Sequence, residues 1–129
     1  MRKAKQVSVW VEDRPGMLGE VASALGAKKV NIVAFMAGVI GGRGGIRLVV
    51  DKLAVAKQIF AECGWETSEE DVIQITLGDK PGALGRAVSK LGEAGINIRY
   101  AYTGSASSAQ KVNTYLAVAD VNAALKALR

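Results

Sequence analysis

The residues of this sequence best suited to chemistry lie in two matching corners, Asp13–Gly16 and Asp79–Gly82, which read D-R-P-G and D-K-P-G. In each corner a proline ends a strand pattern, and a glycine leads into a helical one. The first N–H groups of a helix have no partner within it and favour a carboxylate, while the aspartate beside them could accept an ammonium group. Each corner could thus hold a free amino acid. An aspartate that only caps its own turn would give the same pattern.

The composition offers few residues for catalysis. The 129 residues include no histidine and one cysteine, Cys63, so a Cys/His nucleophile, an ordinary zinc site and an internal disulfide lack their residues. Acid–base catalysis near neutral pH would need a carboxylate or lysine with a strongly shifted pKa. We therefore expect a protein that is not an enzyme, with no catalytic residue, metal site or cofactor. Cys63 falls on the apolar face of a predicted helix, which predicts a core thiol.

The charge and hydropathy patterns restrict the partners. The formal net charge is +5, but the basic residues are scattered, which favours a solvated basic surface over a nucleic-acid footprint. No apolar run approaches the roughly 20 residues of a membrane helix, and the start "MRKAKQ" leads into an alternating strand pattern. We expect a cytoplasmic protein without membrane association.

An internal repeat organises the chain. Pro15 and Pro81 are 66 positions apart, and this offset relates residues 7–36 to residues 73–102 without a gap. Each copy opens with an alternating strand, at 7–11 and 73–77. An apolar helical spacing follows each corner in both copies: Leu18, Val21, Ala22 and Leu25 in the first, and Leu84, Ala87, Val88 and Leu91 in the second.

The remaining elements repeat in the same order. The first helices should end near Gly26 and Gly92, and second strands should begin at Val30 and Ile96. Third strands are expected at residues 46–50 and 112–118. Each is followed by an aspartate in an N-cap position and a second helix, and these aspartates are Asp51 and Asp120.

This order predicts an α+β fold of two ferredoxin-like βαββαβ repeats, with antiparallel sheets and helices on one face. We expect the first domain at residues 1–70, including a strand around 66–70, and the second at residues 71–129. The second domain has no final strand in the sequence. Its first strand should therefore have an unpaired edge open to another chain or a missing tail.

Other features suggest simple structural roles. The glycine-rich run at residues 38–46 is expected to be a flexible hairpin loop that joins the second and third strands, with an anion nest around Arg43 a distant second interpretation. Its counterpart at residues 103–111 is expected to be a loop of different composition. Trp10 should face away from the helices, where it packs against a partner sheet or remains a surface aromatic. Arg99 either holds a ligand carboxylate or is an ordinary edge-strand charge.

The residues "VSVWVEDRPGMLGEVASALGAKKVNIVAF" and "VIQITLGDKPGALGRAVSKLGEAGINIRYAY" together resemble the ACT domain, a small regulatory module of amino-acid metabolism. The resemblance covers essentially the whole chain as two tandem copies. It implies paired sheets, with an amino acid bound between the corner of one copy and the second strand of its neighbour. The first copy departs from the family pattern at "KKVNI", where a glycine usually precedes the apolar residue. Many members also carry asparagine at the two aspartate positions.

The resemblance also implies a set of ligand-binding residues. These are Asp13, Gly16, Met17, Leu18 and Asn31 from the first copy, and Asp79, Gly82, Ala83, Leu84 and Asn97 from the second. The leading hypothesis is a non-catalytic regulator that binds a free amino acid and forms a homodimer. The alternative is a ligand-free regulatory subunit or assembly module of an amino-acid biosynthetic enzyme. Nucleic-acid binding is disfavoured, because the expected third strands lack an aromatic platform.

Overall fold

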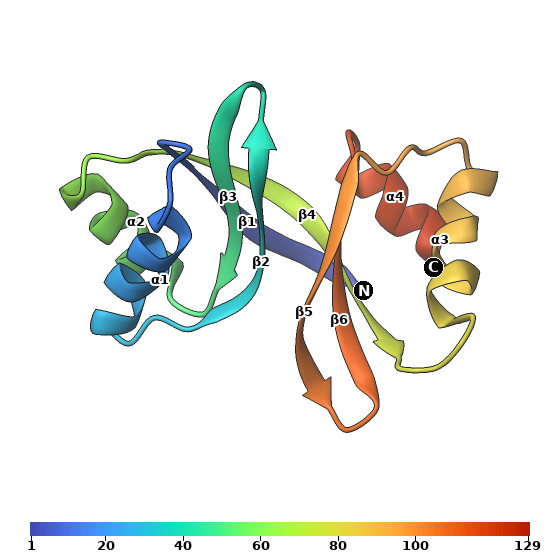
Figure 1. Ribbon diagram of the computed structural model, residues 1–129. Helices are drawn as coiled ribbons and strands as arrows, with labels where there is room; N and C mark the ends of the chain where they lie inside the picture. The colour runs from blue at the N-terminus through green and yellow to red at the C-terminus, as the bar shows by residue number, and fades with distance from the viewer. The chain divides into compact units, whose positions relative to one another are not determined.

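The computed structural model describes the backbone of all 129 residues and every side chain except those of Ile40, Ala106 and Ser107. The chain divides into two compact units, one of residues Lys5–Glu70 and one of Met1–Ala4 with Asp71–Arg129 (Figure 1). The elements are β1 (Arg2–Val11), α1 (Met17–Ala27), β2 (Ile32–Ile40), β3 (Arg43–Val50), α2 (Leu53–Glu62), β4 (Glu66–Gly78), α3 (Ala83–Glu93), β5 (Tyr100–Ser108), β6 (Lys111–Ala117) and α4 (Val121–Leu128).

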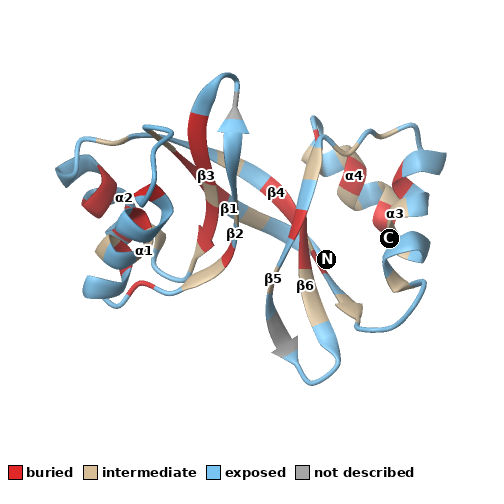
Figure 2. Ribbon diagram, viewed as in Figure 1, coloured by how far each residue is buried: buried red, intermediate tan, exposed pale blue. Residues whose placement is uncertain are grey.

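The Lys5–Glu70 unit is an antiparallel sheet covered on one face by α1 and α2 (Figure 1). β3 lies between β1 and β2 and pairs antiparallel with both. The first residues of β4 lie on the other side of β1. There the side chains of Gln6 and Ser8 each donate a hydrogen bond to the Glu70 carboxylate at 3.1 Å. Alternate residues of β1 and β3 bury their side chains against the helices. This core includes Val7, Val9, Val21, Leu25, Leu48 and Phe60 (Figure 2).

The second unit has the same arrangement. β6 pairs antiparallel with both β4 and β5, while α3 and α4 cover one face. Its core includes Ile73, Leu91, Leu116, Val118, Ala124 and Leu128. On the opposite face Tyr115 stacks on Tyr102 with ring centroids 5.4 Å apart, and burial raises the pKa of Tyr115. Both units confirm the predicted ferredoxin-like fold.

The N-terminal residues alter one expectation. The first residues of β1 are grouped with Asp71–Arg129, β1 neighbours β4, and Arg2 Nη2 lies 3.5 Å from Gln74 Oε1. The edge of β4 that was expected to be unpaired therefore has a partner within the chain. These residues occupy the position of the final strand that the second repeat lacks in sequence.

The hairpin predicted at residues 38–46 is confirmed, and the segment 103–111, expected to be a loop, is also a β-hairpin. β2 and β3 are joined by Gly41 and Gly42, which have φ angles of 57° and 78°. A two-residue turn with positive φ at both positions matches the twist of the flanking strands, and glycine adopts such angles freely. β5 and β6 likewise turn at Gln110, with φ at 65°. The strands of both hairpins extend further toward the turns than the sequence predicted, to Ile40 and from Arg43 in the first hairpin.

The helix ends also differ in detail. Gly26 and Gly92 lie inside α1 and α3, and the left-handed residues that follow these helices are Lys29 (φ 58°) and Gly95 (φ 73°). The Asp120 carboxylate caps α4 by accepting from the Ala123 N–H at 3.0 Å, as predicted. α2 instead begins after Lys52, which has no side-chain cap.

The core-thiol prediction for Cys63 was wrong, since Cys63 is exposed. It follows the last residue of α2 at the C-cap, and the chain then turns at Gly64, which has φ at 73°. The helical spacing therefore no longer determines its direction. Across the described residues, none of the helices has the length and apolar character required to cross a membrane.

Candidate functional site

The first corner leaves the start of α1 uncapped by any side chain. Gly16 has φ at 87° and the helix begins at Met17. The first helical hydrogen bond runs from the Glu20 N–H to the Gly16 carbonyl at 2.9 Å. The Met17 N–H makes only a long 3.4 Å contact with the Arg14 carbonyl. The amides that open α1 are therefore the positive end of a helix without a capping carboxylate.

Asp13 is exposed, and it lines the smaller of the two cavities described below together with Met17 and Leu18, at the start of α1. Within the described part of the chain, neither the Asp13 nor the Asp79 carboxylate takes part in a hydrogen bond or ion pair. An aspartate that caps its own turn would accept an N–H two or three residues ahead, and neither aspartate does so. Both carboxylates are therefore available to a ligand.

Arg14 is the positively charged side chain of this corner. Its guanidinium bonds Glu20 at 2.9 Å and Glu12 at 3.2 Å. The hydrogen bond to Glu20 raises the pKa of Arg14, and the charges of Glu20 and Glu12 act in the same direction. Arg14 is therefore turned toward these two glutamates and does not neutralise Asp13.

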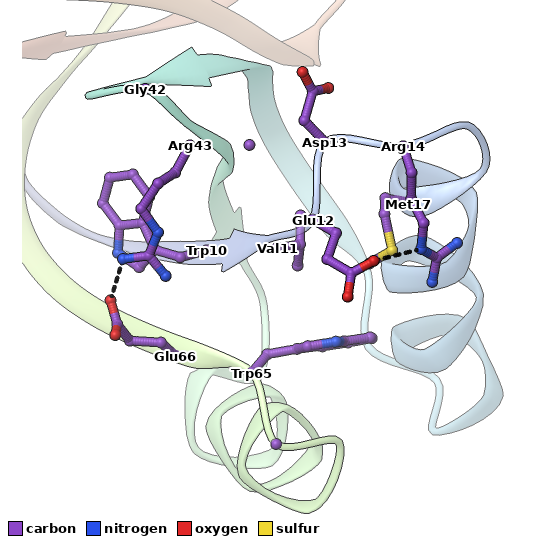
Figure 3. Close-up of a pocket in the computed structure, with 12 residues that line it drawn as sticks. Trp10, Val11, Glu12, Asp13, Arg14, Met17, Gly42, Arg43, Trp65 and Glu66 are labelled. Atoms are coloured by element: carbon purple, nitrogen blue, oxygen red, sulfur yellow. Dashed lines mark hydrogen bonds and ion pairs between the residues drawn. The ribbon is translucent and has the colours of Figure 1, made fainter.

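Two cavities flank the corner within the Lys5–Glu70 unit. The smaller, of about 200 Å³, lies between the corner and the hairpin, and Met17, Leu18 and residues Ala37–Val39 of β2 line it. The larger, of about 550 Å³, lies toward the start of β4. Both share the residues of the corner, including Asp13. Figure 3 shows the larger cavity, with Trp10, Trp65 and Asp13 on different sides of it.

Trp10 carries a cation on its ring. The Arg43 guanidinium carbon lies 5.5 Å from the Trp10 ring centroid, and its Nη1 is 2.9 Å from the Glu66 carboxylate (Figure 3). Trp10 of β1 therefore contacts Arg43 of β3 in its own unit, and packing of Trp10 against a partner sheet remains a prediction. Sequence analysis missed Glu66 and Trp65 as cavity residues. Predicting this cavity would have required the register between β1 and β3, which pairs Trp10 with Gly45, two residues from Arg43.

The second corner has the same backbone and different surroundings. Gly82 has φ at 85° and precedes α3, which has no side-chain cap. The Asp79 N–H donates to the Gln110 carbonyl at 2.7 Å. Arg86 Nη1 lies 2.8 Å from the position that a Cβ would take on Gly82, so a cation covers this corner. Ala83 is half-buried and Leu84 exposed. The adjoining cavity, about 380 Å³, is lined by Gly78–Lys80 and Ala109–Lys111.

The two predicted asparagines lie at the far ends of their own sheets. The Asn31 N–H donates to the Asp51 carboxylate at 2.9 Å, beside the end of β3, whereas Asp13 lies beside its start. Asn97 is likewise separated from Asp79. The Arg99 N–H, two residues after Asn97, bonds the Ala117 carbonyl at the end of β6, whereas the Asp79 N–H bonds the Gln110 carbonyl just before the start of β6. The Arg99 guanidinium donates to the Val118 carbonyl at 3.3 Å. No single unit brings an asparagine to its own corner, so the asparagine assignments remain predictions.

Comparisons with known proteins place the chain in a family. The model of the ACT domain pair family matches residues 2–111. The crystal structure of a Bacteroides thetaiotaomicron protein has a TM-score of 0.86 at 24% identity, covering 98% of this chain and 86% of that chain. The regulatory subunits of aspartate kinase from Thermus thermophilus and Thermus flavus have TM-scores of 0.67 and 0.63, both at 21% identity. These alignments cover 98% and 96% of this chain, and 95% and 89% of the two subunits.

No curated protein sequence matches this chain. The structural likenesses, all at low identity, show a common fold. The family match extends over most of the chain and includes both corners. This chain therefore belongs to the ACT domain pair family, whose fold it shares with regulatory subunits of aspartate kinase.

Proposed function

We propose that the protein is a non-catalytic regulator that binds a free amino acid at its strand–helix corners. The observation that carries the proposal is the Asp13 carboxylate, which has no partner among the described residues, beside the uncapped start of α1. The amides carry the partial positive charge of a helix N-terminus and Asp13 carries a carboxylate, so together they complement the two charged ends of an amino acid. Membership of the ACT domain pair family supports a regulatory role.

The smaller cavity suits this ligand. The ligand carboxylate accepts hydrogen bonds from the N–H groups of Met17 and Leu18, and the ligand ammonium group donates to the Asp13 carboxylate. The side chain then extends toward Ala37–Val39. The volume of this cavity, about 200 Å³, lies below the range of roughly 300–1,000 Å³ that is typical of small-molecule sites. The cavity therefore favours a small amino acid.

A bound amino acid regulates only if it binds two states of the protein unequally. The partner that reads this difference is an enzyme of amino-acid metabolism or a second copy of the chain. The fold shared with proteins named as regulatory subunits of aspartate kinase supports an enzyme partner.

The test is a thermal-shift screen of the chain against each standard amino acid at millimolar concentration. A ligand at about 100 times its Kd stabilises the folded state by about 2.7 kcal/mol. We expect a Tm increase of several degrees from one amino acid or a few related ones. Asp13→Ala should weaken binding by about tenfold to a hundredfold, because a hydrogen bond to a charged group contributes roughly 1.5–3 kcal/mol.

Asp79→Ala and Glu93→Ala serve as matched variants. Asp79→Ala measures how much the second corner contributes to amino-acid binding. We expect a smaller loss of affinity than in Asp13→Ala, because Arg86 covers Gly82. Glu93 is exposed at the end of α3 and its replacement should leave the shift unchanged. An unchanged affinity in the double aspartate variant, or no shift with any amino acid, would contradict the proposal.

A ligand-free assembly module is the second candidate. Phe35 and Val39 lie on β2 with exposures of 49% and 65%, unusual for large apolar side chains on a strand. A protein partner would cover them. In that case Phe35→Ser with Val39→Ser should abolish co-purification of an enzyme, and the amino acids should leave the complex unchanged.

A further inference from the structure

The larger cavity beside the first corner contains both tryptophans of the chain, Trp10 and Trp65. Its volume of about 550 Å³ lies within the range of roughly 300–1,000 Å³ that is typical of small-molecule sites. Trp65 is half-buried and its ring centroid lies 6.1 Å from that of Phe60, which belongs to the core. The core contact therefore fixes one aromatic wall of the cavity.

The charges that line this cavity are acidic in sum. They comprise three carboxylates, of Glu12, Asp13 and Glu66, and two guanidiniums, of Arg14 and Arg43. Arg14 is further shared with Glu20 outside the cavity. A local negative excess on a chain of net charge +5 disfavours an anionic ligand here and favours a cationic one.

The protein already holds one cation in this environment. Arg43 lies over the face of Trp10 and bonds Glu66, so an indole and a carboxylate together stabilise a guanidinium (Figure 3). A cation above an indole is stabilised by the ring quadrupole. Asp13 provides a second carboxylate without a partner among the described residues. The same combination of aromatic surface and carboxylate is thus available to a second cation.

We propose that this cavity binds a small organic cation, an amine or guanidinium compound whose carbon skeleton lies against the indoles and whose charge pairs with Asp13 and Glu12. The cavity shares Asp13 with the smaller cavity that faces β2, and it differs from that cavity in containing both tryptophans. Arg43 competes for the Trp10 face and repels the ligand, and it therefore sets the affinity. The ligand needs no carboxylate, which distinguishes this site from an amino-acid site at the corner.

Intrinsic fluorescence of the full chain tests the proposal, because both reporters line the cavity. Three probes of similar shape are titrated: benzylamine, benzyl alcohol and benzoate. We expect a saturable change with benzylamine, binding of benzyl alcohol weaker by about threefold to thirtyfold, and no binding of benzoate. Equal responses to the amine and the alcohol, or no response to the amine, would overturn the proposal.

Variants separate charge recognition from general damage. Arg43→Gln removes the competing cation and should tighten benzylamine binding by about threefold or more, an improvement that partial unfolding could not produce. Glu12→Gln should weaken it by a similar factor. Glu93→Gln removes the same charge from exposed α3 and should change nothing. The proposal fails if Arg43→Gln does not bind more tightly or if Glu12→Gln matches Glu93→Gln.

Asp13 belongs to both proposed sites, so the two proposals are distinguished by the ligand that binds and by Glu12. A benzylamine signal without stabilisation by any amino acid would support the cation site and contradict the amino-acid site. Stabilisation by an amino acid without a benzylamine signal would do the reverse. Glu12 is the chosen probe because the amino-acid site as proposed uses Asp13 and the α1 amides and does not use Glu12.

Discussion

Single glycines decide whether the corner can exist. Gly16 and Gly82 both have positive φ, 87° and 85°, and each stands immediately before a helix. That conformation turns the chain so that the helix begins with free amides and the aspartate stands beside them. The sequence predicted both corners because proline and glycine constrain the backbone directly. It could not predict that Arg43 would stack on Trp10, because that contact depends on the register between β1 and β3, which are distant in the sequence.

Paired alanine substitutions test this assignment at Gly16. In Gly16→Ala a side chain must adopt φ at 87°, although no atom lies within 4 Å of the new Cβ. We expect a loss of roughly 1–2 kcal/mol in the free energy of unfolding from backbone strain alone. Gly19→Ala, three residues on within α1 and equally open, should stabilise the fold by about 0.5–1 kcal/mol. Chemical denaturation measures both, and changes of the same sign would contradict the assignment.

At the scale of elements, the sequence predicted order and type well and boundaries less well. The 66-residue repeat and its apolar spacings predicted two sheets, each with helices on one face. The structure confirms this prediction. The glycine run at residues 38–46 forms the predicted hairpin, but its turn is confined to Gly41 and Gly42, whose positive φ angles the composition does not reveal. The Asp51 carboxylate binds the Asn31 N–H instead of capping α2, a tertiary contact beyond local pattern.

The backbone just after α1 is strained at Lys29, and a substitution there should relieve the strain. Lys29 has φ at 58° where the second repeat has Gly95 at 73°, so a residue with a Cβ occupies a left-handed position. Lys29→Gly should raise the free energy of unfolding by about 0.5–1 kcal/mol, since strain is relieved at some cost in chain entropy. Lys28→Gly is the matched control, because Lys28 has φ at −103° and has no such strain to lose. A gain in the control equal to that in Lys29→Gly would refute this reading.

Over the whole molecule, a duplicated fold carries corners that have diverged. The first corner adjoins two cavities, one of which contains both tryptophans. The second corner is covered by Arg86. The backbone of the corner is a requirement of the fold and is retained in both copies. The surrounding side chains come from hairpins and strand starts that the repeat does not constrain. Ligand preference is therefore expected to differ between the two halves of the chain.

The most direct test at this scale is removal of Met1–Ala4. These residues belong to the unit of Asp71–Arg129, where β1 lies beside β4. Without them the part of β4 that begins at Asp71 keeps β6 and loses its neighbour in β1, and each backbone hydrogen bond lost should cost that unit about 0.5–1.5 kcal/mol. Hydrogen exchange should show faster exchange in Asp71–Gly78 and unchanged protection at Val9. Arg2→Ala, which removes only the exposed bond to Gln74, should have little effect. Equal loss of protection in both units would mean that the N-terminal residues stabilise the chain generally and do not serve as the final strand of the second repeat.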